Sequence, residues 1–352
     1  MRIFMLSFVD DPHKSGNPYV YTLMDAISSK HMDVEFGTQK WIFWSKEIFT
    51  YDLIHIMWPD ALVNDKHHTI EEVNNRLLEL KLVKKTIVCT CHNLHSNHWW
   101  DRVDIEAYDT VYQYANVFIH LGRYSQQILQ QKYPSAHHVY IPHHVYNTVY
   151  TCIPTREESI EKLRLPNHKY AICLGSFRNR EEKKLFFRIA GGFKKSDVFC
   201  IAPSLMIDVP QGKINKRWIK QRIKLFVIKL KYPNVIYNIG FVSHELIPYY
   251  FAVSDISIIQ RLDILNSGNV PLGMYFGNVI LGPNVGNVHE ILEETGNPCF
   301  DVQDLSSIDK ACGDAVKARL NNIGERNRAF AIKNWSTENI SEKVYLLYKS
   351  VI

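Results

Sequence analysis

The chain of 352 residues is 46% hydrophobic and 22% charged and carries a net charge of +5, which is the size of two domains and the composition of a soluble globular protein. Its seven cysteines are odd in number and scattered, which argues against a disulfide framework and favours a reducing compartment. No apolar run approaches the ~18 residues of a membrane span, and the apolar start is too short for a signal peptide, so we expect a cytoplasmic protein.

Short β-branched runs alternate with helical patterns through the first half of the chain, which predicts a parallel sheet covered by helices. Strands are expected at 2–9, 52–58, 85–91 and 137–144, helices at 17–31 and around 70–81, and a helix followed by a strand within 108–122. The pattern lapses after residue 146. We therefore predict an N-terminal domain at 1–150 and an inter-domain linker at 151–166.

The second half of the chain repeats this alternation. Strands are expected at 169–177, 197–203, 234–242, 255–260 and 278–282, and helices at 181–193, 216–231, 244–254, 270–277 and 288–295. A helical tail covers 326–352, with Ser336 and Glu338 near a cap. These elements predict a C-terminal domain at 167–330 and a final helix at 331–352 that returns to the N-terminal domain. Two doubly wound α/β domains facing one another would place a ligand cleft at the carboxyl ends of both sheets.

A basic segment stands out within the second half. No acidic residue lies between Asp208 and Glu245, whereas residues 213–231 hold eight lysines and arginines. Apolar residues recur at helical spacing in 216–231, which predicts a basic amphipathic helix. Its apolar stripe either packs on its own domain or meets a pyrophosphate-bearing lipid or an anionic membrane on the inner face of the plasma membrane. Nucleic acid is not expected, because no stacking motif accompanies the charge.

Three glycine-containing turns follow predicted strands of the C-terminal domain, at 175–180, 265–269 and 282–286. A glycine at such a turn lets backbone amides approach a ligand closely, and the start of a helix favours an anion. Arg178 and Arg180 in the first turn could clamp a phosphate. Together the turns predict a nucleotide diphosphate site. The P-loop motif is absent from the sequence.

Several motifs then occur in one order along the chain. GSFRNR, NIGFVSHELIPYYFAVSDI and NSGNVPLGMYFGNVILGPNVGNVHE, together with NPYVYTLMDAI, HIMWPD, CHNLHSNH and YIPHHVY in the first half, resemble GT-B glycosyltransferases related to glycosyltransferase family 4. The resemblance covers nearly the whole chain. It implies a GT-B fold, with a nucleotide-diphosphate sugar donor in the C-terminal domain and an acceptor in the N-terminal domain.

The resemblance also assigns donor-binding residues. Arg178 and Arg180 would stabilise the diphosphate leaving group, with Lys183 as an alternative to Arg180, and Ser267 and Gly268 would donate hydrogen bonds to phosphate. Glu290 matches a family glutamate that either contacts the ligand or supports a helix N-terminus. The full expected set is Gly175, Ser176, Arg178, Arg180, Asn266, Ser267, Gly268 and Glu290.

One departure from the family pattern concerns the two glutamates spaced E-x7-E. Ile264 and Leu272 occupy the aligned positions, so the sugar and ribose contacts must come from elsewhere, and Asp263 and Asn266 are nearest by position. A retaining outcome is implied by the family alone. The Asp-x-Asp tripeptide that holds a metal in other glycosyltransferases is absent from the sequence. We therefore predict metal-independent transfer, with no cofactor besides the donor.

The segment TCHNLHSNHWW at residues 90–100 follows a predicted strand and is rich in histidine. Its spacing is unlike a standard structural zinc site, which leaves a zinc site, a polar loop or a cleft residue as alternatives. We favour His92, with Asn93 beside it, as a catalytic group that hydrogen-bonds an acceptor hydroxyl or the transferred sugar, or acts as a base. Asn17, His98 and His143 are candidate acceptor contacts, although Asn17 would equally serve as a helix cap.

These observations predict a hexosyltransferase that moves a sugar to a glycan or lipid-linked acceptor hydroxyl in surface polysaccharide or glycolipid synthesis. A nucleotide-sugar epimerase of the same architecture is the nearest enzymatic alternative. A catalytically idle nucleotide-binding module is the alternative outside enzymes, because both family glutamates are missing.

Overall fold

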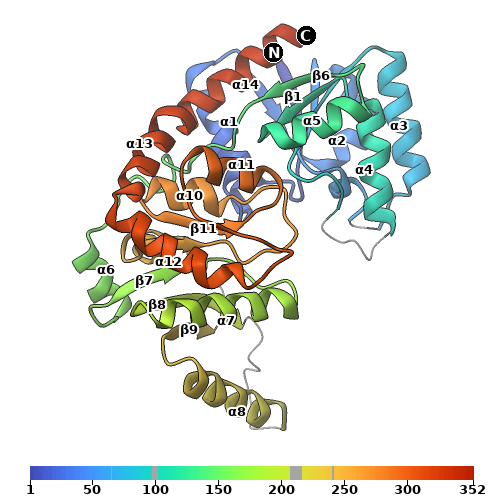
Figure 1. The fold of residues 1–352 in the computed structure, drawn as a ribbon. Coiled ribbons are helices and arrows are strands. Elements are labelled where there is room, and N and C mark those ends of the chain that lie inside the picture. Colours follow the sequence, from blue (N-terminus) through green and yellow to red (C-terminus); the bar gives the residue numbers. More distant parts are fainter. Residues whose placement is uncertain (65, 97–101, 207–215, 240–241) are drawn as a thin grey trace. The chain divides into compact units, whose positions relative to one another are not determined.

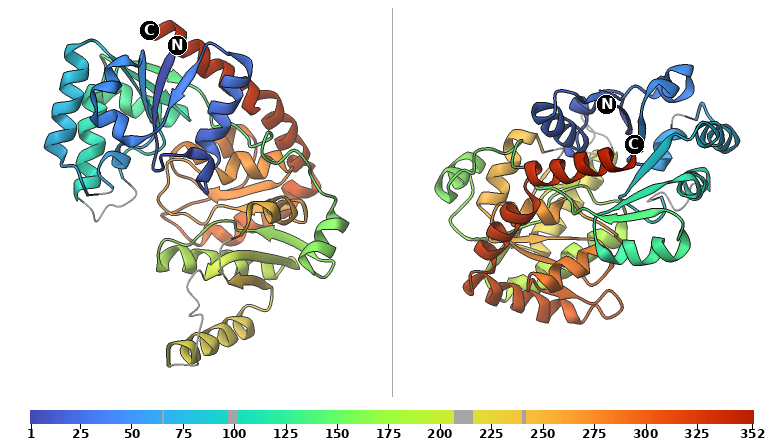
Figure 2. Two further views of the ribbon diagram at one scale, coloured as in Figure 1. Left: turned by 180° about the vertical axis from the view of Figure 1, so that it is seen from behind. Right: turned by 90° about the horizontal axis from the view of Figure 1, so that it is seen from above.

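The computed structural model describes residues 1–64, 66–96, 102–206, 216–239 and 242–352. The chain forms two compact units (Figure 1). The N-terminal unit comprises Met1–Val149 and Asn334–Ile352, and the C-terminal unit comprises Tyr150–Lys333. Each unit contains a six-stranded sheet in which every paired neighbour is parallel, and helices cover the sheets (Figure 2). The predicted doubly wound α/β architecture is confirmed.

The sheet of the N-terminal unit has the strand order β2-β1-β3-β4-β5-β6. Its strands are β1 (Arg2–Leu6), β2 (Glu35–Gly37), β3 (Leu53–Ile56), β4 (Thr86–Cys91), β5 (Val117–His120) and β6 (His137–Tyr140). Because the chain runs outward in opposite directions from β1 and β3, the topological switch point lies between these two strands, where doubly wound folds bind ligands.

The helices of this unit include one from the far end of the chain. They are α1 (Tyr19–Lys30), α2 (Lys40–Trp44), α3 (Ile70–Leu82), α4 (Arg102–Tyr114), α5 (Arg123–Lys132) and α14 (Thr337–Val351), with short 3-10 turns at Pro12–Lys14, Lys46–Thr50 and Pro59–Leu62. Helix α14 lies along α1 (Figure 2), and the buried Tyr348 hydroxyl lies 2.6 Å from His55 Nδ1 of β3. The predicted return of the last helix to the N-terminal unit is confirmed.

The sheet of the C-terminal unit has the order β12-β11-β10-β7-β8-β9. Its strands are β7 (Lys169–Ile172), β8 (Val198–Met206), β9 (Val235–Ile239), β10 (Ile256–Ile258), β11 (Val279–Pro283) and β12 (Cys299–Phe300). The switch point here lies between β7 and β10, which pair directly through Ala171 with Ile256 and Ile172 with Ser257.

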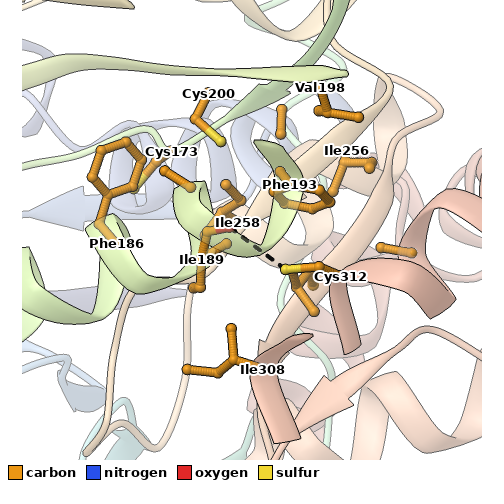
Figure 3. Packing of buried hydrophobic residues seen from close by; sticks show 14 of the residues in the cluster. Cys173, Phe186, Ile189, Phe193, Val198, Cys200, Ile256, Ile258, Ile308 and Cys312 are labelled. Carbon is orange, nitrogen blue, oxygen red and sulfur yellow. Dashed lines mark hydrogen bonds between the residues drawn. The ribbon is translucent and has the colours of Figure 1, made fainter. Parts of the chain in front are cut away.

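Helices α7 and α12 pack against this second sheet. The helices of the unit are α6 (Arg156–Leu163), α7 (Arg180–Lys194), α8 (Lys216–Lys231), α9 (Ile247–Ala252), α10 (Asn269–Tyr275), α11 (Gly286–Glu294), α12 (Ser307–Leu320) and α13 (Ile323–Trp335), which leads into the other unit. Figure 3 shows Phe186 and Phe193 of α7 among the buried strand residues. At Gly192 a Cβ would lie 2.9 Å from Cys312 Sγ, so the close contact of α7 with α12 requires glycine there.

Several boundaries differ from the sequence-based expectation. The expected linker contains α6, which begins with a reciprocal capping box between Thr155 and Glu158. The expected helix at 244–254 is divided into a 3-10 turn, His244–Leu246, and α9. The expected tail is two helices, because the Ser336 hydroxyl accepts from Asn339 N at 3.3 Å and starts α14. Among the described residues, no helix is both long and apolar enough to cross a bilayer.

Candidate functional site

A buried carboxylate lies beside the switch point of the C-terminal unit. Glu182, in the first turn of α7, is only 4% exposed and accepts hydrogen bonds from Arg178 Nε at 2.9 Å and from the Arg178 backbone at 2.7 Å. Arg261, which follows β10, donates to the same carboxylate through Nη1 and to the Ser176 carbonyl through Nη2 at 3.1 Å. Two guanidinium groups therefore share one carboxylate, and the negative charge of Asp263 also acts on Arg178.

The positive charge of this arginine cluster is partly shielded from water. Arg178 has 32% and Arg261 17% of its side chain exposed. Burial, and then the neighbouring charge of Arg261, lower the pKa of Arg178 below its ordinary value. Arginine remains charged at neutral pH even so. A partly desolvated guanidinium at a helix N-terminus is well suited to bind an anion such as a phosphate.

The turn after β7 carries the arginine cluster. Gly175 has φ of +102°, a conformation that side chains other than glycine rarely adopt. The Asn269 side chain at the start of α10 donates to the Leu174 carbonyl at 2.8 Å, which ties the turn after β7 to the loop after β10. Asn179 caps α7 by accepting from Glu182 N at 2.9 Å. Arg180 is exposed at the first residue of α7.

The loop containing Asn266, Ser267 and Gly268 packs against the start of α11. Gly286 has φ of +59°, and a Cβ there would lie 2.5 Å from the Ile264 carbonyl, so the two segments approach at backbone distance. Asn287 Nδ2 donates to Asn266 Oδ1 at 2.8 Å. The structure therefore brings the predicted second and third turns together, and it uses the Asn266 side chain to hold them.

The remaining donor-side residues differ in their environments. Glu290 is half-buried in α11. Asp263 is exposed, and its carbonyl accepts from Arg178 Nη2 at 3.5 Å. Of the two positions that align with the family glutamates, Leu272 is buried in α10, whereas Ile264 is half-buried.

In the N-terminal unit, the loops after β1, β3 and β4 bring a set of aromatic rings together. His92 follows β4 and stacks on Trp58 with ring centroids 4.6 Å apart. Tyr19 at the start of α1 meets the His92 ring edge-on at 4.8 Å. Tyr19 also stacks on His144 at 4.8 Å and lies 4.6 Å from His143. His92 and His143, which the sequence analysis selected, thus both contact the Tyr19 ring. All three residues lie in segments that follow the carboxyl ends of strands.

The histidines of this ring cluster are uncharged at neutral pH. Burial, and then the charge of His144, lower the pKa of His92 to about 3. Burial also lowers the pKa of His143 well below its ordinary 6.5 and that of His144 below 6.5. His143 Nδ1 lies 2.7 Å from the His144 carbonyl, which can only accept, so neutral His143 donates there and its Nε2 is an acceptor 3.3 Å from the Tyr146 hydroxyl.

Other predicted residues of this unit have local structural partners. Asn93 donates through Nδ2 to the Tyr108 hydroxyl at 3.3 Å, and its carbonyl accepts from the Tyr112 hydroxyl at 2.7 Å. Asn17 Oδ1 accepts from Tyr19 N at 3.1 Å before α1. His95 is exposed, and its Nδ1 lies 3.1 Å from the Ser96 carbonyl. His98 lies outside the described residues.

All seven cysteines are in the described part of the chain and are free thiols. Cys89 and Cys91 are buried in β4, and burial raises the pKa of the Cys91 thiol to about 12 and that of the Cys89 thiol further. Both are therefore protonated thiols at neutral pH. Within the described ranges, no group of three or more histidine, cysteine, aspartate or glutamate side chains has the arrangement of a metal site.

Some residues of these clusters had no role in the sequence analysis, among them Glu182, Arg261 and Trp58. Glu182 stands in the first turn of α7, four residues after Arg178, which precedes the helix cap, and this short separation is visible in the sequence. Arg261 is 83 positions away from Arg178 and 79 from Glu182 in the chain. Only the pairing of β7 with β10 brings it to the cluster.

Comparison with known proteins supports the fold. No protein-family model and no curated protein sequence matches the chain. Sucrose-phosphate synthase from Thermosynechococcus elongatus aligns over 99% of this chain and 98% of that chain, with a TM-score of 0.72 at 14% identity. Anabaena HepE, solved in complex with UDP and glucose, aligns over 99% of this chain and 100% of its own, with a TM-score of 0.68 at 15% identity.

A third similar structure is named as an epimerase. A putative UDP-N-acetylglucosamine 2-epimerase from Listeria monocytogenes aligns over 99% of this chain and 96% of that chain, with a TM-score of 0.64 at 9% identity. At identities this low, the property shared with all three is the fold. The chain has the GT-B fold of these enzymes, as the sequence predicted. Membership of family 4 stays a prediction.

Proposed function

We propose that this chain is a glycosyltransferase that uses a nucleotide-diphosphate sugar and binds the donor diphosphate in its C-terminal unit. The observation that carries the proposal is the arginine cluster, in which Arg178 and Arg261 share the buried Glu182 next to Gly175 at the β7–β10 switch point. This position is where doubly wound folds bind ligands, and the guanidinium groups there are partly exposed and partly desolvated, which suits an anion. The glycosyltransferases with the same fold, including HepE with UDP, are consistent with it.

In this proposal, Arg178 stabilises the negative charge that develops on the diphosphate as the glycosidic bond breaks. Arg261 acts as a positioning residue, because its guanidinium is directed to Glu182 and the Ser176 carbonyl. Arg180 and Lys183 supply further positive charge from the first turn of α7, and Ser267 and Gly268 offer hydrogen-bond donors from the loop after β10. Glu290 is proposed as a donor contact.

We assign acceptor binding to the N-terminal unit, with His92 as its central residue. An imidazole with a pKa of about 3 is neutral at physiological pH, but it is a weak base, and general-base catalysis is most efficient when the pKa lies near the working pH. This low pKa therefore favours a hydrogen bond from His92 to a sugar or acceptor hydroxyl over proton abstraction. His143 and the loop at Asn93 support the same ring cluster.

The proposed reaction is transfer to a hydroxyl of a glycan or lipid-linked acceptor in surface polysaccharide or glycolipid synthesis, at the cytoplasmic side of the membrane. We propose a retaining and metal-independent reaction. Saturating EDTA should leave the turnover unchanged. Loss of turnover in EDTA that a divalent ion restores would contradict metal independence.

The proposal is tested by thermal unfolding of the full chain with UDP, GDP, ADP and CMP sugars, beginning with UDP-glucose. A ligand at ~100 times its Kd stabilises the folded state by about 2.7 kcal/mol, so one nucleotide class should raise the Tm and the others should not. The stabilisation should be lost in Arg178→Ala and kept in Arg188→Ala, an exposed arginine of α7. Absence of stabilisation by every nucleotide would overturn the proposal.

A nucleotide-sugar epimerase is the second candidate, favoured by the epimerase-named structure of the same fold. The two functions differ when no acceptor is present. Incubation of the stabilising donor alone, followed by chromatography of its sugar, should return the donor unchanged. Epimerised or hydrolysed sugar would instead favour the epimerase, and binding without turnover on any acceptor would indicate an idle module.

A further inference from the structure

Helix α8 exposes an apolar surface that the rest of the described chain does not cover. It connects β8 to β9 at the edge of the sheet (Figure 1). Phe226 is 64% exposed and Leu230 is 68% exposed. No other helix within the described ranges carries more than two large exposed hydrophobic residues. On α8 there are five: Ile219, Ile223, Phe226, Val227 and Leu230.

The five apolar residues form one stripe on α8. Positions 219, 223, 226 and 230 repeat at the three- and four-residue spacing of a single helix face, and position 227 extends it. Leu225 stands on the opposite side and is only 7% exposed, and its carbonyl accepts from the Tyr237 hydroxyl of β9 at 3.2 Å. The helix thus contacts its own unit through Leu225 and turns the stripe away. The alternative in which this stripe packs on its own domain is wrong.

Positive charge accompanies the stripe. Lys220, Lys229 and Lys231 are exposed on α8, and no acidic residue occurs anywhere from 209 to 244. A helix with an apolar face beside basic residues lies in the interface of a lipid bilayer, with the apolar face among the acyl chains and the lysines among anionic headgroups. The apolar stripe alone would be enough to bind an apolar protein surface, and the positive charge alone would be enough to bind a nucleic acid. The coincidence of both on one helix favours a membrane.

We propose that α8 docks this protein on the surface of an anionic lipid bilayer, with the five apolar side chains inserted and the lysines at the headgroups. This proposal does not rest on the proposed donor site, because α8 contributes no residue to the arginine cluster. It would place a sugar-transferring unit at the surface where lipid-linked acceptors reside. The docking is peripheral and reversible, since a single amphipathic helix inserts only into the interface.

The test is sedimentation of the full chain with vesicles of phosphatidylcholine alone or mixed with phosphatidylglycerol. Binding is expected to the mixed vesicles and to weaken in high salt. Each lysine near an anionic surface contributes about fivefold to partitioning, so Lys220, Lys229 and Lys231 changed together to Gln should weaken binding about 100-fold. Phe226→Ser with Leu230→Ser should weaken it at least about tenfold, because two large apolar side chains are no longer buried.

Matched controls separate docking from general effects. Leu320→Ser, an exposed leucine of α12, should leave vesicle binding unchanged, and so should Lys194, Lys195 and Lys310 changed together to Gln, which are exposed lysines elsewhere in the unit. All variants should keep the thermal unfolding of the parent, because every changed residue is exposed. Failure of the parent to sediment with anionic vesicles would overturn the proposal. The proposal would also be overturned if light scattering showed that the parent is a dimer and that Phe226→Ser with Leu230→Ser makes it a monomer, since the stripe would then bind a second copy of the chain.

Discussion

In the C-terminal unit, the strands at the switch point hold two guanidiniums against one buried carboxylate, whereas the corresponding loops of the N-terminal unit gather uncharged rings. The backbone plan is similar in the two units, with six parallel strands and a switch point at the first strand. The side chains are opposite in character. Glu182 is nearly inaccessible but doubly paired, while His92, His143 and His144 are held neutral by burial.

This difference shows how a shared fold separates two chemical tasks. A charge removed from water must be paired, and guanidinium groups that stay partly exposed can still bind an anion. A set of neutral imidazoles carries no charge, and it offers hydrogen bonds and flat apolar faces instead. The first arrangement suits a diphosphate and the second suits a sugar or an acceptor hydroxyl. The variants below test that division of tasks.

The largest effect is expected from Arg178→Ala. Loss of one preorganised donor to a developing negative charge typically reduces turnover about 10²–10³-fold, and the loss should appear in donor affinity as well. Steady-state transfer kinetics with the stabilising donor measure both. The control is Arg188→Ala, which changes an arginine of α7 that is paired only loosely with Asp309 at 3.8 Å. Near-parental kinetics of Arg178→Ala would remove the charged cluster from the donor site.

A loss of turnover without a loss of donor affinity is expected from His92→Ala. A hydrogen-bonding group at a reacting hydroxyl contributes roughly 10²-fold, and the nucleotide should still raise the Tm because the arginine cluster is intact. His95→Ala, an exposed histidine of the same loop, should transfer at the parental rate. A smaller rise in the Tm of His92→Ala with the nucleotide would contradict the division of tasks between the two units, since the ring cluster would then contribute to donor binding.

The sequence predicted much of the fold because its signals are local. Alternating strand and helix patterns, turns with glycine and a final amphipathic helix each reflect the properties of neighbouring residues. Helix α12 and helix α5 were not expected. Both contain short apolar stripes interrupted by polar residues, so their burial on the sheet depends on partners distant in the chain rather than on their own pattern.

The candidate site was less predictable for the same reason. Arg178 and Gly175 stand in one turn and could be selected from the sequence, as could His92 at the end of a strand. Arg261 has no local motif, and its partnership with Glu182 exists only because β10 pairs with β7. The stacking of Trp58 on His92 likewise depends on β3 lying beside β4. Contacts between residues on neighbouring strands can be predicted only when the strand order of the sheet is known, and the local sequence around each residue does not give that order.

A smaller, global effect is expected on stability at acid pH. The folded-state pKa values of His55 and His92 are about 3, below the ordinary 6.5, so the unfolded chain binds more protons between these values. Their contribution to stability is fully present above about pH 6.5 and is lost as pH falls from 6.5 towards 3. Hydrogen exchange measured at pH 7.5 and pH 5 should show that backbone amides of the N-terminal unit lose protection at the lower pH. The protection of amides in the C-terminal unit should change less.

Substitution of one buried ring tests the cause of this acid effect. His55→Gln keeps a polar group near Tyr348 and Thr90 but removes the ionisation, so the fall of N-terminal protection with pH should become shallower. His137→Gln, at an exposed position of β6, should leave it unchanged. Equal loss of protection in both units would show that acid sensitivity is not a property of the histidine cluster.

The smallest effect is expected from Asn17→Ala, which removes the oxygen that accepts from Tyr19 N at the start of α1. Loss of such a hydrogen-bond acceptor at the start of a helix costs about 0.5–2 kcal/mol of stability, which urea unfolding can measure. The turnover should stay within a factor of about two, because the Asn17 side chain bonds only the backbone of Tyr19 in this structure. Asn17→Asp keeps an oxygen acceptor and should restore the stability. If turnover instead falls steeply while stability is kept, Asn17 contacts the acceptor, and the neutral ring cluster extends to the loop before α1.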